Sequence, residues 1–403
     1  MKITEIKTIR LGEYPNICYV QLITDEGLVG LGETFFSAQS VEGWIHENAA
    51  PILLGRNPLD IEKNWQDLIS FVGGKSTGAE SRGRSALDIA AWDLLGKACG
   101  QPLYRLLGGK SRDGIPVYNT CAGSHYTQKV SKTGHPSDDK GRGQSGMYED
   151  YDAFMERADE LAIDLVEQGY TGMKIWPFDA FCAKSNGHYI SPEDLKKGCE
   201  PFAKIRKAVG DRIEIMVEMH SRWDLPTAKR IARALEEFDP FWYEDPIQVY
   251  NMDALREFAV STRVPTAASE TVGGTFSYRD ICDKKAADIL IFDPTWTGGV
   301  TEARKIAAIA EAHELPITTH DCVGPLSYTL DVHLSTAFTN AFIQETTRSF
   351  YHGWYRELLT QVPRLQEGKV YALEGCGLGT ELQPDVLKRK DAVVRTTRIS
   401  DII

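Results

Sequence analysis

The feature of this chain that most constrains its fold is a series of short apolar runs that alternate with amphipathic helical patterns from residue 114 onward. Parallel strands buried on both faces appear as continuous apolar runs, and eight strand–helix units in series close into a barrel. We therefore predict a modified (β/α)8, TIM-type barrel. The eight predicted strands are residues 117–121, 172–176, 213–217, 241–243, 265–268, 289–292, 316–319 and 342–344.

Helical spacing of apolar residues predicts the main helices between these strands, at residues 151–168, 192–209, 227–237, 300–313 and 328–338. The segment 124–150 is polar and rich in glycine, so it has little to bury, and we expect a lid or an irregular excursion there. The connection 177–190 is also long for a strand-to-helix loop. Both segments are candidates for the distal wall of a pocket.

The first 115 residues follow a different pattern. Strand-like alternation near the N-terminus, a turn at Asp25-Glu26-Gly27 and a helix between Ser85 and Cys99 that stops at Gly100 predict a small α+β domain. We expect residues 1–115 to form a capping domain that the C-terminal tail, residues 356–403, completes. Residues 116–355 are then the barrel domain.

Composition excludes several classes of protein. The 403 residues carry a net charge of −12, which disfavours nucleic-acid binding because phosphate affinity needs clustered Lys and Arg. Mean hydropathy is −0.29 and no apolar run reaches about 20 residues, so we expect no membrane span and no secretory leader. The eight Cys form no C-x-x-C pair, which is typical of reduced thiols in a cytoplasmic enzyme. We also expect a homo-oligomer.

Three acidic residues recur at a constant interval. Glu218, Glu244 and Glu270 are 26 residues apart, and each closes an apolar run. Strand ends of a barrel converge on one face, where three carboxylates repel each other unless a cation lies between them. An all-oxygen ligand set suits a hard divalent ion, and we predict that these residues hold Mg²⁺.

The series continues along the remaining strands. Asp293, His320 and Glu345 follow the sixth, seventh and eighth predicted strands. An Asp beside a His fixes the imidazole tautomer and raises its basicity, so Asp293 and His320 are predicted to form a general-base pair. Lys174 lies on the second strand near the barrel mouth. His220 is two residues after Glu218, and can therefore face the same site from the wall opposite His320.

In several motifs along its length, the sequence resembles the mandelate racemase subgroup of the enolase superfamily. The N-terminal signature is matched by SALDIAAWDLLGK at residues 85–97, and the barrel motifs by YEDP at 243–246, SET at 269–271 and GGVTE at 298–302. Within the subgroup, EMHSR at residues 218–222 is similar to the acid-x-His-x-Arg motif of the acid-sugar dehydratases of the galactonate type. The resemblance covers nearly the whole chain and implies that loops around Tyr14 and residues 71–80 seal the site.

The resemblance also implies a mechanism. The enzyme would be a hydro-lyase in which His320 removes the proton α to the carboxylate of an aldonate or aldarate and His220 gives a proton to the departing 3-hydroxyl, yielding a 2-keto-3-deoxy acid. Lys174 would contact the substrate carboxylate as a cation, and a protonated Glu345 would donate a hydrogen bond to it.

The chain departs from the family pattern at two positions, and these departures help to weigh dehydration against other possible functions. Glu218 stands where most relatives have Asp, and Trp176 stands where mandelate racemase has the second Lys of its Lys-x-Lys motif. Trp176 removes a base from one face of the α-carbon, which favours dehydration. A racemase or epimerase of an α-hydroxy or amino acid using Lys174 and His320 remains an alternative. So does a mannonate dehydratase, although the loop after the second strand lacks Arg. A non-catalytic sugar-acid binding or regulatory protein is the third.

Overall fold

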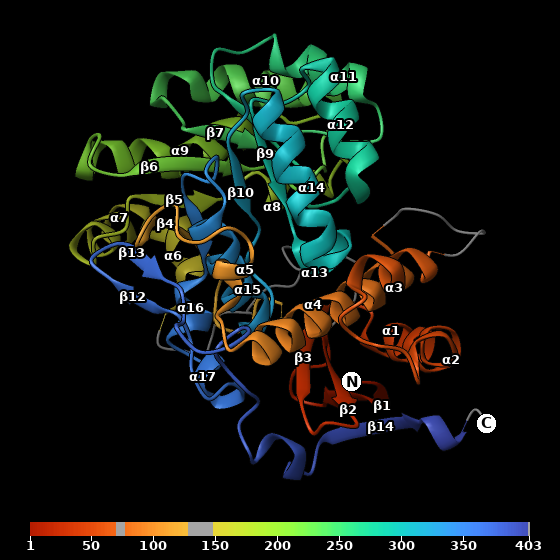
Figure 1. Cartoon of the computed structure of the whole chain (residues 1–403). Coiled ribbons are helices and arrows are strands. Elements are labelled where there is room, and N and C mark those ends of the chain that lie inside the picture. Colours follow the sequence, from red (N-terminus) through yellow and green to blue (C-terminus); the bar gives the residue numbers. More distant parts are fainter. Residues whose placement is uncertain (70–76, 128–147, 402–403) are drawn as a thin grey trace.

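The computed structural model describes residues 1–69, 77–127 and 148–401, which form a barrel with a second, smaller layer against one end (Figure 1). The predicted lid at 124–150 and the predicted loop at 71–80 fall in large part outside the described residues.

Eight short parallel strands form the barrel, and all eight predicted strands are present with bounds shifted by no more than two residues. Neighbours pair in chain order from β4 to β10, β11 pairs with β4, and a bridge between Ile317 and Ala341 closes the ring. The strands are β4 (Ile115–Thr120), β5 (Gly172–Ile175), β6 (Glu214–Glu218), β7 (Trp242–Glu244), β8 (Thr266–Ala268), β9 (Ile289–Phe292), β10 (Ile317–Thr319) and β11 (Gln344–Thr346).

Helices cover the outside of the barrel (Figure 1). Three of them begin where a polar side chain accepts a hydrogen bond from the backbone three residues on, at Ser191, Asp224 and Asn251. Four of the barrel helices, α8, α11, α12 and α13, were not predicted, and the predicted helix 151–168 is divided at Arg157. The helices are α6 (Asp150–Glu156), α7 (Ala158–Glu167), α8 (Asp179–Cys182), α9 (Pro192–Val209), α10 (Leu225–Leu235), α11 (Met252–Ala259), α12 (Gly274–Lys284), α13 (Pro294–Thr297), α14 (Gly299–Ala312) and α15 (Pro325–Ala337).

The smaller layer is the predicted α+β cap. An antiparallel sheet is built from β1 (Ile3–Leu11), β2 (Ile17–Thr24), β3 (Val29–Phe35) and the C-terminal β14 (Ala392–Arg398), which pairs with β1. The long helix α4 (Ala79–Cys99) packs on β3, and a Cβ at Gly32 would collide with the backbone of Ala86. Glycine is therefore required for this close approach. Shorter helices complete the cap: α1 (Ala38–Trp44), α2 (Ala50–Leu53), α3 (Ile61–Asp67) and α5 (Leu103–Leu106).

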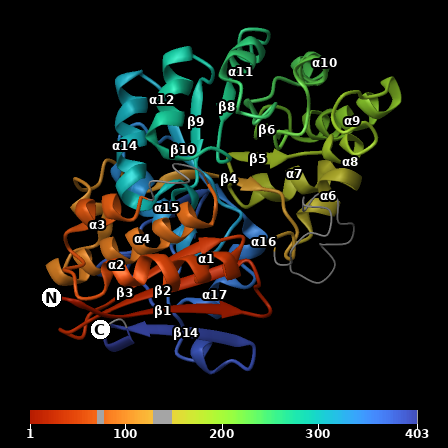
Figure 2. The same ribbon diagram turned by 90° about the vertical axis from the view of Figure 1, so that its right-hand side faces the viewer.

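Helix α4 lies between the cap sheet and the barrel, as Figure 2 shows. Carboxylates of the cap are buried at this junction and accept hydrogen bonds from the first turns of barrel helices. Glu33 accepts from the Ser327 amide and hydroxyl in α15, and Asp88 accepts from the Thr301 amide and hydroxyl in α14. These bonds fix how the cap is seated over the barrel.

The C-terminal tail divides between the two layers. After α16 (Arg348–Tyr351) and α17 (Tyr355–Leu358), the hairpin β12 (Arg364–Gln366) and β13 (Lys369–Tyr371) adds to the start of β4. The chain then continues to the cap, where β14 pairs with β1 over seven residue pairs. The two ends of the chain consequently share one sheet.

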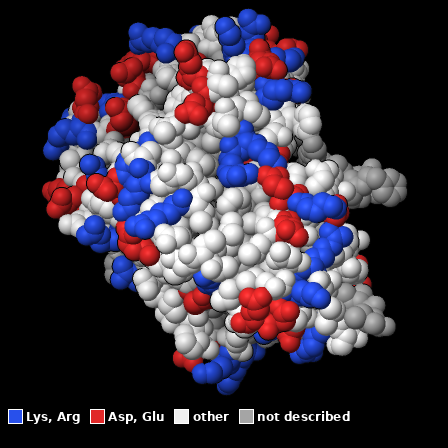
Figure 3. All heavy atoms as spheres, in the orientation of Figure 1, with Lys and Arg blue, Asp and Glu red and all other residues white. Residues whose placement is uncertain are grey.

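The surface shows no segregation of charge on the face in Figure 3, where acidic and basic side chains alternate. None of the described helices combines the length and apolar character that a membrane span requires.

Candidate active site

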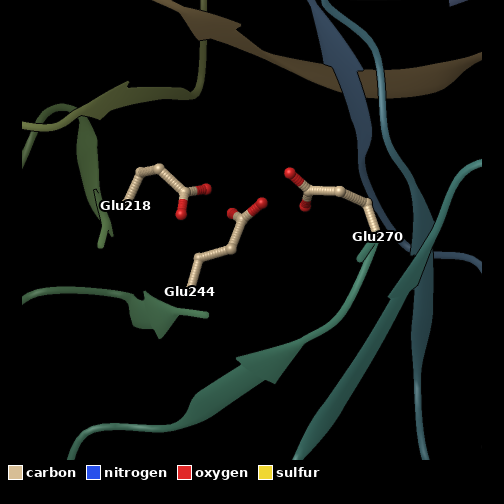
Figure 4. Close-up of side chains that lie close together, drawn as sticks. All are labelled: Glu218, Glu244 and Glu270. Atoms are coloured by element: carbon tan, nitrogen blue, oxygen red, sulfur yellow. The ribbon is translucent and has the colours of Figure 1, made fainter. Parts of the chain in front are cut away.

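Three glutamates converge at the mouth of the barrel. Glu218 and Glu244 are the last residues of β6 and β7, and Glu270 follows the end of β8 by two residues. All three are buried and point toward one another (Figure 4), and each offers an oxygen within 4.8 Å of the other two. Burial and the charge of Glu244 raise the pKa of Glu218 well above its ordinary value. Such a carboxylate set has the chemistry of a divalent-cation site.

Lys174 on β5 reaches into this cluster. Its Nζ lies 2.7 Å from Glu244 Oε1, 2.7 Å from Glu345 Oε1 and 3.6 Å from Glu218 Oε2. Burial would lower the pKa of this amine, but the charges of Glu244 and Glu345 outweigh it and raise the pKa well above its ordinary value. Lys174 is therefore a cation beside the carboxylates.

Glu345 was predicted to follow the eighth strand, but it is the middle residue of β11. Its Oε1 faces Lys174 and accepts a hydrogen bond from the Thr120 hydroxyl, while Oε2 accepts from the amide of Asp321 at 2.9 Å. Both oxygens of Glu345 therefore accept hydrogen bonds within the site, and the donor role towards the substrate carboxylate that the resemblance implied stays a prediction.

His320 follows the last residue of β10 and pairs with Asp293, which follows β9. The distance from Nδ1 to Asp293 Oδ2 is 3.1 Å, and Asp293 Oδ1 accepts from both the amide and the hydroxyl of Thr295. With Nδ1 of His320 as the donor to this carboxylate oxygen, Nε2 faces the cluster, 3.9 Å from Glu270. Burial would lower the pKa of His320, but the charges of Glu270 and Asp293 raise it to about 10.

His220 stands on the other side of the barrel. Strands β6 and β10 are third and seventh in a ring of eight, so the residues that follow them face each other across the mouth. The His220 ring lies 5.5 Å from the Trp176 ring, and its Nδ1 is 2.7 Å from Oδ2 of the buried Asp179 in α8. The backbone amide of His220 donates to Glu218 at 2.6 Å, which ties this histidine to the carboxylate cluster.

Asp179 was missed by sequence reasoning. It does not end a strand but lies on a single helical turn in the connection after β5, 41 residues before His220. No local pattern links two residues at that separation. Trp176 occupies the position of the second Lys in the Lys-x-Lys motif of mandelate racemase. Its ring packs among those of Tyr126, Tyr151 and Phe154, so the wall of the site is apolar at this position.

The cap closes a cavity of about 620 Å3 over this constellation. Its walls include Lys174, Glu218, His220, Glu270, His320 and Glu345 from the barrel and Asn16, Phe36, Ser37, Thr77 and Arg82 from the cap. Asn16 lies near Tyr14, whose surroundings were predicted to seal the site, whereas Ser37 and Arg82 were not foreseen. Within the connection 177–190, Lys184 pairs with Asp194 and Tyr189 is 56% exposed, and neither lines this cavity.

Comparison with known proteins agrees with this architecture. Residues 12–108 match the family model of the mandelate racemase/muconate lactonizing enzyme N-terminal domain, and residues 156–386 match the enolase C-terminal domain-like model. The crystal structure of an enolase of the mandelate racemase subgroup from Agrobacterium tumefaciens is 44% identical, with a TM-score of 0.88 over 100% of both chains.

Among curated proteins, the chain is 29% identical to a D-xylonate dehydratase of Haloferax volcanii, over 96% of this chain and 88% of the relative. It is also 29% identical to a D-galactonate dehydratase of Pectobacterium atrosepticum, over 96% of this chain and 94% of the relative.

Proposed function

Because the chain belongs to the mandelate racemase/muconate lactonizing enzyme family of the enolase superfamily, we propose that it is a Mg²⁺-dependent dehydratase of a sugar acid. The substrate is an aldonate or aldarate, and the product is a 2-keto-3-deoxy acid. The observation that carries the proposal is the presence of two Asp-supported histidines on opposite sides of a three-carboxylate cluster. Dehydration needs one group that accepts a proton and another that returns one to the leaving hydroxyl.

The three glutamates would hold the metal. Bound Mg²⁺ would stabilise the negative charge that develops on the substrate carboxylate as the α-proton leaves. Lys174 adds a positive charge beside the same carboxylate, and Glu345 keeps that lysine protonated and in place.

The proton transfers belong to the two histidines. A cation held by the three glutamates would offset the charge of Glu270, which raises the pKa of His320, so that Nε2 of a neutral His320 accepts the proton from C2 and Asp293 stabilises the imidazolium that forms. His220, positioned by its contact with Asp179, gives a proton to the 3-hydroxyl as the C3–O bond breaks, and water leaves. The resulting enol takes up a proton at C3 and becomes the 2-keto-3-deoxy acid.

The racemase alternative requires Lys174 to act as a base. Its Nζ is engaged in ion pairs with Glu244 and Glu345, which opposes that role, and the indole of Trp176 has no basic nitrogen to take its place. The arrangement therefore favours dehydration over racemisation.

The test is a panel of hexonates, pentonates and aldarates incubated with Mg²⁺ in D₂O. Keto-acid formation and deuterium incorporation at C2 are followed by NMR. Wild-type protein is expected to form a keto acid from at least one member. His320→Asn should lose both dehydration and exchange, by about 10²- to 10⁴-fold, whereas His220→Asn should lose dehydration and retain exchange.

A matched control is His188→Asn. His188 also pairs with an aspartate, Asp224, at 3.2 Å, but its side chain is exposed and does not line the cavity, so activity should not change. Exchange without loss of water from wild-type protein would indicate a racemase or epimerase. Neither keto-acid formation nor deuterium incorporation with any member of the panel would indicate a binding protein.

A further inference from the structure

Arg82 lies in the first turn of α4 and forms part of the cap wall of the cavity. Its Nε donates to the carbonyl of Thr77 at 2.7 Å and its Nη1 donates to the carbonyl of Phe35. The guanidinium lies 4.4 Å from the centroid of the Trp296 ring. These contacts hold the group in one position, but none of them supplies a negative charge.

The other basic groups of the cavity all have carboxylate partners. Lys174 is paired with glutamates, and His320 and His220 are each paired with an aspartate. In the described part of the chain, Arg82 has no carboxylate within ion-pair distance. The charge of Asp293 raises the pKa of Arg82, but the Asp293 carboxylate is already engaged with His320 and Thr295.

Arg82 is partly buried, and removing a guanidinium from water without a counter-ion is unfavourable, so burial lowers the pKa of Arg82 to about 10. The missing counter-ion is best supplied by the ligand. Both N–H groups of Nη2 are left without a protein acceptor among the described residues, so this nitrogen is available for charge-assisted hydrogen bonds to a carboxylate in the cavity.

We propose that Arg82 binds the second carboxylate of a dicarboxylic sugar acid, so that the substrate class is the aldarates and not the aldonates. This inference rests on the proposed function, which places the first carboxylate beside the metal site and Lys174. An aldonate ends in a neutral hydroxymethyl group and would leave Arg82 unmatched. A single guanidinium also matches a carboxylate better than a phosphate dianion, which usually needs further cations.

The test measures binding separately from turnover. His320→Asn serves as the parent protein because it binds acids without converting them. Dissociation constants with Mg²⁺ present are measured by calorimetry for galactarate against galactonate and for glucarate against gluconate. In at least one pair the dicarboxylate should bind at least about tenfold more tightly, the range expected for a charge-assisted hydrogen bond.

Adding Arg82→Gln should weaken binding of that dicarboxylate by about 10- to 100-fold and change the monocarboxylate by less than about threefold. Arg82→Lys, which keeps the charge, should recover part of the loss and serves as the test if Arg82→Gln does not fold. Arg84→Gln is the matched control, because Arg84 lies two residues along α4 over the Trp65 ring and outside this cavity.

Equal affinities within both pairs in the parent protein would overturn the proposal. So would equal weakening of both members of a pair by Arg82→Gln, which would show a structural role. A third arm uses 6-phosphogluconate, and Arg82-dependent binding confined to that ligand would assign the site to a phosphate and contradict the carboxylate. If wild-type protein binds dicarboxylates through Arg82 but dehydrates none, the proposed function fails while the Arg82 site stands.

Discussion

At the scale of single residues, the site is a set of charges that depend on one another. Lys174 lies between carboxylates from β7 and β11, and the backbone of His220 is bonded to Glu218. Removing any one of these groups leaves a buried charge unpaired, which is more damaging than the loss of a single hydrogen bond.

The metal prediction is tested at Glu244. Glu244→Gln keeps the shape of the side chain but removes one of three carboxylates, so Mg²⁺ affinity should fall by at least about 100-fold. Isothermal calorimetry on the metal-free protein measures this directly, and wild-type protein should melt at a higher temperature when Mg²⁺ is added. Glu193→Gln, at an exposed carboxylate, is the control. Unchanged affinity in Glu244→Gln would exclude this cluster as the metal site.

Asp179 is expected to act as a positioning residue for His220. Asp179→Asn should lower the rate of dehydration by about 10- to 100-fold and leave exchange at C2 intact, because only the return of the proton is affected. In the His220→Asn background the same change should have no further effect. An additive loss there would contradict the pairing.

Sequence reasoning located the residues at or near strand ends, because the barrel itself converts a spacing along the chain into proximity in space. Glu218, Glu244 and Glu270 are brought together as expected. Asp179 and Arg82 could not be found in this way. Their partners lie on other elements, and only the folded structure brings Asp179 to His220 and Arg82 to the wall of the cavity.

At the scale of elements, the junction of cap and barrel is built from helix N-termini whose amides and hydroxyls donate hydrogen bonds to buried carboxylates of the cap. Burial raises the pKa of Glu33 from 4.5 to about 7 and that of Asp88 from 3.8 to about 7, despite the hydrogen bonds from α15 and α14 that oppose the shift. The strands of the barrel could be predicted from apolar runs, whereas this junction could not, since it joins residues about 200 to 300 positions apart.

These shifts predict a pH dependence of stability. From about pH 4 to about pH 7 the unfolded chain ionises at Glu33 and Asp88 before the folded chain does, so their contribution to stability falls as pH rises. The slope is at most about 1.4 kcal/mol per pH unit for each group, and the loss is complete above about pH 7. Urea midpoints measured between pH 5 and 8 should show a weaker dependence in Glu33→Gln and in Asp88→Asn. An unchanged slope in both variants would refute this account.

At the scale of the whole molecule, the cap depends on both ends of the chain. Strand β14 covers the outer edge of β1, although its Val393 and Val394 are 47% and 44% exposed, so its contribution is mainly the ladder of backbone hydrogen bonds. The sequence predicted that the tail returns to the cap, but not that the hairpin β12–β13 stays on the barrel. The predicted domain boundaries near residues 115 and 355 remain predictions.

Deleting residues 392–403 should lower the free energy of unfolding by about 3 kcal/mol, given several lost hydrogen bonds of about 0.5–1.5 kcal/mol each. Amides of β1 to β3 should lose protection in hydrogen exchange, and activity should fall with them because the cap walls the cavity. Deleting only residues 399–403, beyond β14, is the control. Undiminished protection of β1 after the longer deletion would show that the sheet does not need its fourth strand.

The cavity is lined partly by the barrel and partly by the cap, and this division bears on how such a protein can evolve. Every group assigned to proton transfer or metal binding comes from the barrel or its loops, whereas Asn16, Ser37 and Arg82 come from the cap. Mutations in the cap can therefore redirect the protein to a new acid while the bond-breaking groups are inherited unchanged. Recombining the cap of one relative with the barrel of another in the laboratory would therefore change substrate selectivity while keeping the groups that transfer protons and bind the metal.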